Sequence, residues 1–121
     1  MGRDILVVDD DTDVLNSVRD IFEHEGYIVK TVHNGLECIK ELEKGFMGIV
    51  LLDLMMPKMD GWDTIKEIVK RGFQKKVAIL IITAIGSPDH EKMNGVEPYV
   101  HDYIVKPFNI NDLVSSVESL H

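Results

Sequence analysis

The stretch from Ile49 to Gly61 constrains the fold of this chain most, and it reads Ile-Val-Leu-Leu-Asp-Leu-Met-Met-Pro-Lys-Met-Asp-Gly. Four consecutive aliphatic residues, two of them β-branched, are typical of a strand buried on both faces. The run ends at Asp53, and Pro57 then favours a loop. A buried carboxylate needs a partner, and open α/β sheets bind ligands at the carboxyl ends of their strands. Asp53 is therefore a candidate site residue, although an ordinary cap or loop aspartate would look the same in isolation.

Strands and helices are predicted to alternate five times along the chain. The predicted strands are Ile5–Val8, Tyr27–Val32, the run ending at Asp53, Val77–Ile82 and Asp102–Val105. Segments with a 3.6-residue apolar period lie between them, and these segments predict helices. Their expected starts are Asp11 or Thr12, Asn34-Gly35, Asp60 or Gly61, Ser87-Pro88-Asp89, and Asn109. This alternation predicts an α/β fold, a parallel sheet with helices on both faces, in which the very apolar Val77–Ile82 is a central strand.

Length and charge narrow the class of protein. The 121 residues fit one domain, residues 1–121, and the formal net charge of −8 argues against direct nucleic-acid binding by this domain. No apolar run approaches the length of a membrane span, so no membrane insertion is expected. The single cysteine, Cys38, has no partner for an internal disulfide and is expected in the core. This cysteine usage fits a cytoplasmic protein.

Polar residues follow four of the five predicted strands. Asp9 and Asp10 follow the first, Asp53 the third, Thr83 the fourth and Lys106 the fifth. Because parallel strands direct their carboxyl ends to one edge of the sheet, these residues are expected to form one site.

The chemistry of this set is specific. Three crowded carboxylates need a cation, and oxygen ligands suit a hard ion such as Mg²⁺. Lys106 and the Thr83 hydroxyl suit an incoming phosphoryl dianion. An aspartate between metal and lysine can act as a nucleophile and form an aspartyl phosphate, with positioning and charge neutralisation supplying most of the catalysis.

The chain resembles the two-component response-regulator receiver domains, which include the single-domain chemotaxis receiver. The resemblance covers Ile5 to Leu120 and rests on five short motifs in a fixed order. They are Val7-Val8-Asp9-Asp10, Leu52-Asp53-Leu54-Met55-Met56-Pro57, Met59-Asp60-Gly61, Ile82-Thr83-Ala84 and Tyr103-Ile104-Val105-Lys106-Pro107-Phe108. The resemblance implies a flavodoxin-like (βα)5 fold with strand order 2-1-3-4-5.

The resemblance also implies a role for each site residue. Asp53 would accept the phosphoryl group, and Lys106 would pair with that group or with Asp53. Asp10, Asp53 and the backbone carbonyl of Met55 would ligate Mg²⁺ directly, with Asp9 acting mostly through water. Thr83 would bind a phosphoryl oxygen and Tyr103 would be the aromatic switch. The remaining implied feature is a cis bond before Pro107.

The implied partners are a sensor histidine kinase or a phosphotransfer protein upstream, and a target protein or fused output domain downstream. Dimerisation on activation is compatible with the resemblance. Such a domain is not an enzyme in the usual sense, because it catalyses only its own phosphorylation and dephosphorylation.

Two other interpretations account for part of the sequence. Asp9-x-Asp11 after a first strand also resembles the haloacid-dehalogenase-type phosphatases, with Asp9 as nucleophile. That interpretation leaves Asp53 without a nucleophilic role and the chain without room for a cap domain. An interaction module that never receives phosphate would be favoured if Asp10, Asp53, Thr83 or Lys106 were missing, and all four are present.

Overall fold

A five-stranded parallel sheet forms the centre of the computed structural model, which describes residues 4–86 and 90–120. Its strand order is β2-β1-β3-β4-β5, as the resemblance implied. The strands are β1 (Asp4–Val8), β2 (Ile28–Val32), β3 (Gly48–Leu52), β4 (Val77–Thr83) and β5 (Val100–Val105). The predicted α/β class and doubly wound arrangement are thus confirmed, and Val77–Thr83 is an interior strand between β3 and β5.

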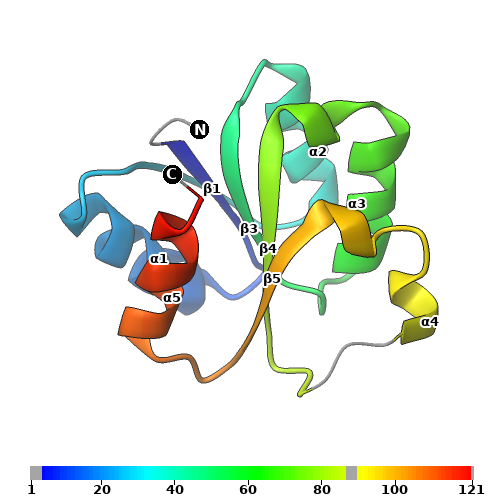
Figure 1. Cartoon of the computed structure of the whole chain (residues 1–121). Coiled ribbons are helices and arrows are strands. Elements are labelled where there is room, and N and C mark those ends of the chain that lie inside the picture. The colour runs from blue at the N-terminus through cyan, green and yellow to red at the C-terminus, as the bar shows by residue number, and fades with distance from the viewer. Residues whose placement is uncertain (1–3, 87–89, 121) are drawn as a thin grey trace.

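Helices cover both faces of the sheet (Figure 1). One face carries α1 and α5, and the other carries α2 and α3, with α4 beside α3. The helices are α1 (Thr12–His24), α2 (Gly35–Glu43), α3 (Gly61–Lys70), α4 (His90–Met93) and α5 (Ile110–Glu118). Among the described residues no helix is both long enough and apolar enough to cross a membrane.

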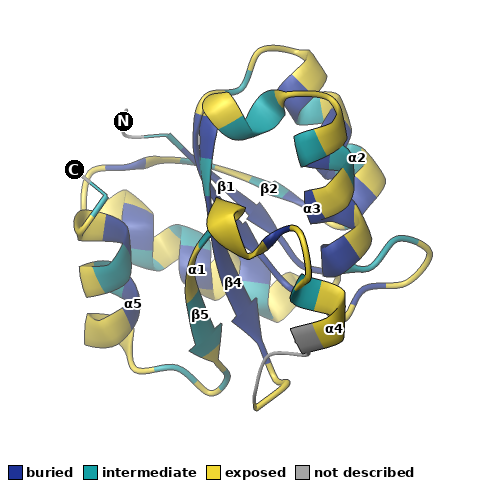
Figure 2. Ribbon diagram, turned by 45° about the vertical axis from the view of Figure 1, so that its right-hand side comes forward, coloured by how far each residue is buried: buried dark blue, intermediate teal, exposed yellow. Residues whose placement is uncertain are grey.

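The sheet separates two apolar clusters, because successive residues of a strand point to opposite faces. Along β1, Leu6 and Val8 belong to the cluster under α2 and α3, whereas Ile5 and Val7 belong to the cluster under α1 and α5. Figure 2 shows the result, with the buried sides of α1, α2, α3 and α5 turned toward the sheet. Cys38 is 0% exposed in the first cluster, which confirms that it is a core residue.

Side-chain caps fix where the helices begin. Asp11, rather than Thr12, caps α1, and its carboxylate accepts the N–H of Asp13 at 2.9 Å. Asp60 caps α3 in the same way, so of the two predicted starts the helix begins at Gly61. Asn34 and Asn109 cap α2 and α5 as predicted. Each cap satisfies backbone donors that the first helical turn leaves unpaired.

Several boundaries differ from the sequence predictions. Tyr27 does not belong to β2, because its N–H bonds to the Phe22 carbonyl in the turn after α1. β5 begins at Val100 instead of Asp102, and its register with β4 shifts between Ile79 and Leu80. Two short 3₁₀ helices, Phe73–Lys75 and Glu97–Tyr99, were not predicted. The predicted helix start at residues 87–89 lies outside the described residues.

Candidate phosphoryl-acceptor site

The register of the sheet places the predicted site residues next to one another. Val8 of β1 pairs with Leu52 of β3, so Asp9 and Asp53 leave neighbouring strands at the same level. At the other side of the site, Thr83 pairs with Val105, and the Lys106 N–H donates to the Thr83 carbonyl at 2.7 Å. Parallel pairing alone therefore brings together residues from four separate parts of the chain.

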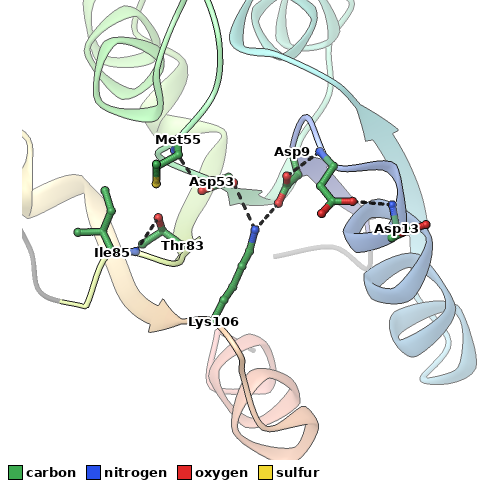
Figure 3. Close-up of polar contacts among 8 residues, drawn as sticks. Asp9, Asp13, Asp53, Met55, Thr83, Ile85 and Lys106 are labelled. Carbon is green, nitrogen blue, oxygen red and sulfur yellow. Dashed lines mark hydrogen bonds and ion pairs between the residues drawn. The ribbon is translucent and has the colours of Figure 1, made fainter.

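Lys106 bridges two of the carboxylates (Figure 3). Its Nζ lies 2.7 Å from Asp9 Oδ2 and 3.3 Å from Asp53 Oδ2. The side chains of Asp9 and Asp53 are only 3% and 8% exposed, whereas that of Lys106 is 20% exposed. The ammonium thus offsets two buried negative charges that would otherwise repel each other.

The second oxygen of each buried carboxylate accepts a backbone N–H. Asp9 Oδ1 accepts from Asp11 at 2.9 Å, and Asp53 Oδ1 accepts from Met55 at 3.1 Å. Each donor lies two residues beyond its aspartate, in the loop that leaves the strand. Both oxygens of each carboxylate therefore have a partner, and this fixes the direction in which each group points.

Burial and neighbouring charges shift the pKa values of Asp9 and Lys106. Burial raises the pKa of Asp9, and the negative charge of Asp53 raises it further, against the hydrogen bonds from Lys106 and the Asp11 N–H. Burial alone would lower the pKa of Lys106, but its hydrogen bond to Asp9 and the charge of Asp53 outweigh burial and raise it. Lys106 therefore stays positively charged at neutral pH.

Asp10 completes an acidic cluster at the opening of the site. Asp9, Asp10 and Asp53 each offer a carboxylate oxygen, and these oxygens lie within 4.8 Å of one another. Asp10 is exposed, in contrast to the other two. A set made only of oxygen donors, with one side open to water, fits a hard divalent ion such as Mg²⁺.

Thr83 and Tyr103 both contact Ile85. The Ile85 N–H donates to the buried Thr83 Oγ1 at 3.4 Å, and the Tyr103 hydroxyl donates to the Ile85 carbonyl at 3.1 Å. Partial burial raises the pKa of the Tyr103 phenol. A single backbone segment after β4 thus connects the hydroxyl in the site to the aromatic ring on β5.

An open hollow of about 410 Å³ borders the acidic cluster. Met55 and Ile85 contribute apolar side chains to it, and they are 58% and 37% exposed. Lys92 and Trp62 also line this hollow. Exposed apolar side chains therefore lie beside the acidic cluster on this side.

All the predicted site residues lie at this edge of the sheet, and the Lys106–Pro107 bond is cis, as the resemblance implied. One detail differs from expectation, because the shorter contact of Lys106 is with Asp9 and not with Asp53. The Asp11 N–H and the Ile85 backbone also belong to the site and were not predicted. Backbone donors and acceptors carry no sequence signal, so only their place after a strand could have pointed to them.

A parallel α/β sandwich with paired aspartates, a threonine and a lysine at the carboxyl ends of its strands defines a class of signalling domain. Residues 5–118 match the family model described as "Response regulator receiver domain". The chain therefore belongs to the response-regulator receiver family. Receiver domains of this family are signalling domains of two-component systems.

Among curated proteins, the chain is 36% identical over 116 residues to the transcriptional regulatory protein CpxR homolog of Haemophilus influenzae. It is 34% identical over 120 residues to the response regulator MprA of Mycobacterium tuberculosis. These matches cover 96% and 99% of the chain but 49% and 51% of the relatives. The chain thus spans about half the length of these curated relatives.

Solved structures agree with the fold. A CheY-like receiver domain protein from Methanospirillum hungatei matches with a TM-score of 0.90 and 42% identity, over 98% of this chain and 94% of that one. The response regulator TrrA of Thermotoga maritima, solved in complex with Mg²⁺ and BeF, matches with a TM-score of 0.84 and 30% identity, over 99% of this chain and 100% of that one. No comparison supports the phosphatase alternative.

Proposed function

We propose that residues 1–121 form a receiver domain that accepts a phosphoryl group on Asp53 in a Mg²⁺-dependent reaction. The observation that carries this proposal is that the Asp53 carboxylate lies 3.3 Å from the Lys106 ammonium and in one cluster with the carboxylates of Asp9 and Asp10. A nucleophile in this position has one positive charge from the protein and room for a second from a metal ion. That arrangement meets the main requirement of phosphoryl transfer, which is charge neutralisation around an in-line attack.

In this reaction a carboxylate oxygen of Asp53 attacks the phosphorus of a phosphohistidine. A new O–P bond forms, the N–P bond to the imidazole breaks, and the bond electrons leave on the imidazole nitrogen, which takes a proton. The backbone N–H of Met55 holds the nucleophile in one orientation, 3.1 Å from Asp53 Oδ1. Lys106 moves from the carboxylates to the incoming phosphoryl oxygens as their negative charge arrives.

The Mg²⁺ ligands would be the carboxylates of Asp10 and Asp53 and the backbone carbonyl of Met55, with Asp9 acting through water. A bound Mg²⁺ supplies further charge neutralisation at the phosphoryl oxygens. The buried Asp9 has its own lysine partner at 2.7 Å, which supports an indirect role for it. The exposed Asp10, by contrast, keeps its carboxylate at the open side of the cluster.

The signal would leave the site through Thr83 and Tyr103. A phosphoryl oxygen would accept a hydrogen bond from the Thr83 hydroxyl, which in this structure contacts the Ile85 N–H at 3.4 Å. A shift of Ile85 would then remove the carbonyl that the Tyr103 hydroxyl now contacts at 3.1 Å. Tyr103 would be released to change the surface of β5, which is an edge strand.

The partners would be a sensor histidine kinase or a phosphotransfer protein upstream. Downstream, the changed surface would contact a target protein or a fused output domain, with dimerisation on activation as one form of output. The curated relatives are about twice as long as this chain, which supports an output domain in proteins of this kind. We place the domain in the cytoplasm, where a phosphohistidine donor would meet it.

The proposed function is tested with a small phosphodonor. Wild-type protein is incubated with acetyl phosphate and Mg²⁺, and intact mass reports one added phosphoryl group. Chelation of the metal and the substitution Asp53→Asn should each abolish the added mass, whereas Asp13→Asn, at an exposed position in the first turn of α1, should not. Equal labelling of wild type and Asp53→Asn would refute the proposal.

A further inference from the structure

Gly61 brings the start of α3 directly against the backbone that follows Asp53. The Gly61 N–H donates to the Leu54 carbonyl at 3.0 Å, and Gly61 is buried. The preceding residue, Asp60, caps the helix by accepting the N–H of Asp63 at 2.8 Å. The motif Met59-Asp60-Gly61 thus joins α3 to residues 53–55, which we call the acceptor loop. Nothing in the proposed chemistry requires this contact.

No side chain fits at position 61. A Cβ atom there would lie 2.5 Å from the Asp53 carbonyl oxygen, 2.7 Å from Leu54 Cα and 2.9 Å from Leu54 Cδ2. Real Cβ atoms essentially never approach another heavy atom within 3.0 Å, so one of the two segments would have to move. The two nearest atoms belong to the backbone and cannot rotate away as a flexible side chain can.

Position 61 needs a glycine because there is no room for a Cβ atom, and not because of its backbone conformation. The described glycines with positive φ are Gly26, Gly45, Gly48, Gly72 and Gly95, and Gly61 is not one of them. Glycine is also a poor helix former, so the local helix gains nothing from it. The close approach to the Asp53–Leu54 peptide is what only glycine permits.

A side chain at position 61 would press directly on the acceptor loop. β3 pairs with β1 and β4 along its length, and α3 is anchored by its buried residues Trp62, Ile65 and Ile68. The Asp53 N–H donates to the Val8 carbonyl at 3.0 Å and Leu54 is 3% exposed, so the Asp53–Leu54 peptide also has a fixed place. Because the Cβ would clash with this peptide itself, any movement that relieves the clash on this side carries the Asp53 carboxylate and Met55 with it.

We propose that Gly61 is a positioning residue of the phosphoryl-acceptor site. By letting the start of α3 pack against the Asp53–Leu54 peptide, it sets where the Asp53 carboxylate and the Met55 carbonyl lie. Gly61 itself touches neither phosphoryl group nor metal. This inference rests on the proposed function, but the position of the acceptor loop can be measured without any ligand.

The chain offers a matched control in Gly48. Like Gly61, it is a buried glycine whose added Cβ would meet backbone atoms, here the carbonyl group of Asp4. Gly48 begins β3, so it lies at the opposite end of that strand from Asp53. Gly61→Ala and Gly48→Ala should both lower stability, but only Gly61→Ala should disturb the site.

Three measurements compare the variants with wild type. The amide resonance of Met55 in the metal-free protein reports its 3.1 Å hydrogen bond to Asp53. Calorimetric titration with Mg²⁺ gives a dissociation constant, and acetyl phosphate gives the rate of phosphoryl uptake. We expect Gly61→Ala to shift the Met55 resonance, weaken Mg²⁺ binding and slow uptake roughly tenfold or more, because small misplacements of reacting groups have large effects on rate. Gly48→Ala should match wild type in all three.

A Gly61→Ala protein that keeps the wild-type Met55 resonance and Mg²⁺ affinity would overturn the inference, and so would equal losses in both variants. If wild type takes up no phosphate, the proposed function fails, while the resonance and the Mg²⁺ titration still decide the role of Gly61. If Gly61→Ala does not fold by itself, the comparison is repeated in trimethylamine N-oxide, which favours the folded state. Rates are then expressed per folded molecule.

Discussion

The Lys106 ammonium lies 2.7 Å from an Asp9 carboxylate oxygen, although 97 residues separate the two in sequence. Its distance to Asp53 is longer, at 3.3 Å. In the absence of metal, Lys106 therefore offsets the repulsion within the acidic cluster mainly through Asp9. The same lysine remains within reach of Asp53, so an arriving phosphoryl group can draw it across the site.

Removing this cation should destabilise the metal-free fold. We expect Lys106→Met to lower the free energy of unfolding by about 2 kcal/mol, because two buried carboxylates lose their charged partner. Urea unfolding without metal measures the loss. Lys44→Met is the control, because the Lys44 side chain is 72% exposed and lies 3.6 Å from Glu41 in a surface pair worth less than about 1 kcal/mol. A smaller loss for Lys106→Met than for the control would contradict this account of the cluster.

Substitution of Asp10 should have the opposite effect on stability. Asp10→Asn removes one like charge from the exposed side of the cluster, and we expect the metal-free protein to gain about 1 kcal/mol. Mg²⁺ binding should weaken in the same variant. Asp9→Asn should gain less than Asp10→Asn, since it also removes the charged partner of Lys106 at 2.7 Å. Thermal melting with and without Mg²⁺ distinguishes the two, and a large drop in Tm for Asp10→Asn would show that Asp10 is structurally paired.

The fold could be predicted, and so could the meeting of the site residues at one edge of the sheet, because both follow from the pattern of apolar runs in the sequence. Alternating apolar runs fix a parallel sheet, and a parallel sheet brings Asp9, Asp53, Thr83 and Lys106 to one edge. The preference of Lys106 for Asp9 could not be predicted, since it depends on differences of less than 1 Å between side-chain positions. The close approach at Gly61 was likewise hidden, because a glycine at a helix start has several explanations until its neighbours are known.

The apolar side chains of Met55 and Ile85 beside the site should prolong the life of the aspartyl phosphate. Hydrolysis needs a water aligned opposite the Asp53 oxygen, and neither Met55 nor Ile85 can hold one by a hydrogen bond. The double variant Met55→Asn with Ile85→Glu should lose phosphate on the order of tenfold faster, which corresponds to about 1.4 kcal/mol in the barrier.

Decay of the phosphorylated proteins, followed by intact mass, measures this effect. Met47→Asn is the control, because Met47 is 59% exposed but precedes β3, at the opposite edge of the sheet. Equal decay in wild type and the double variant would show that these side chains do not set the lifetime.

Cys38 should make stability depend on pH in the alkaline range. Burial, with a smaller effect of Glu41, raises the pKa of the Cys38 thiol from 9.0 to about 12. The folded protein thus holds this proton more tightly, so the contribution is complete below pH 9 and is lost as pH rises toward about 12.

Urea unfolding on either side of pH 9 measures this dependence, whose slope for one thiol is at most about 1.4 kcal/mol per pH unit. Cys38→Val should remove the part of the pH dependence that comes from the thiol. The part that comes from the tyrosine phenols should remain. The native thiol should also resist Ellman's reagent until the protein is unfolded. Rapid reaction of the folded protein would show that Cys38 is reached without unfolding.

The most direct test of the central claim is to locate the phosphoryl group chemically. The protein is treated with acetyl phosphate and Mg²⁺ and then with sodium borohydride, which reduces an aspartyl phosphate to homoserine. Peptide sequencing by mass spectrometry then identifies the reduced position. The account predicts homoserine at position 53 only, and none when Mg²⁺ is chelated. Homoserine at Asp9 or Asp10, or a metal-independent product at position 53, would contradict it.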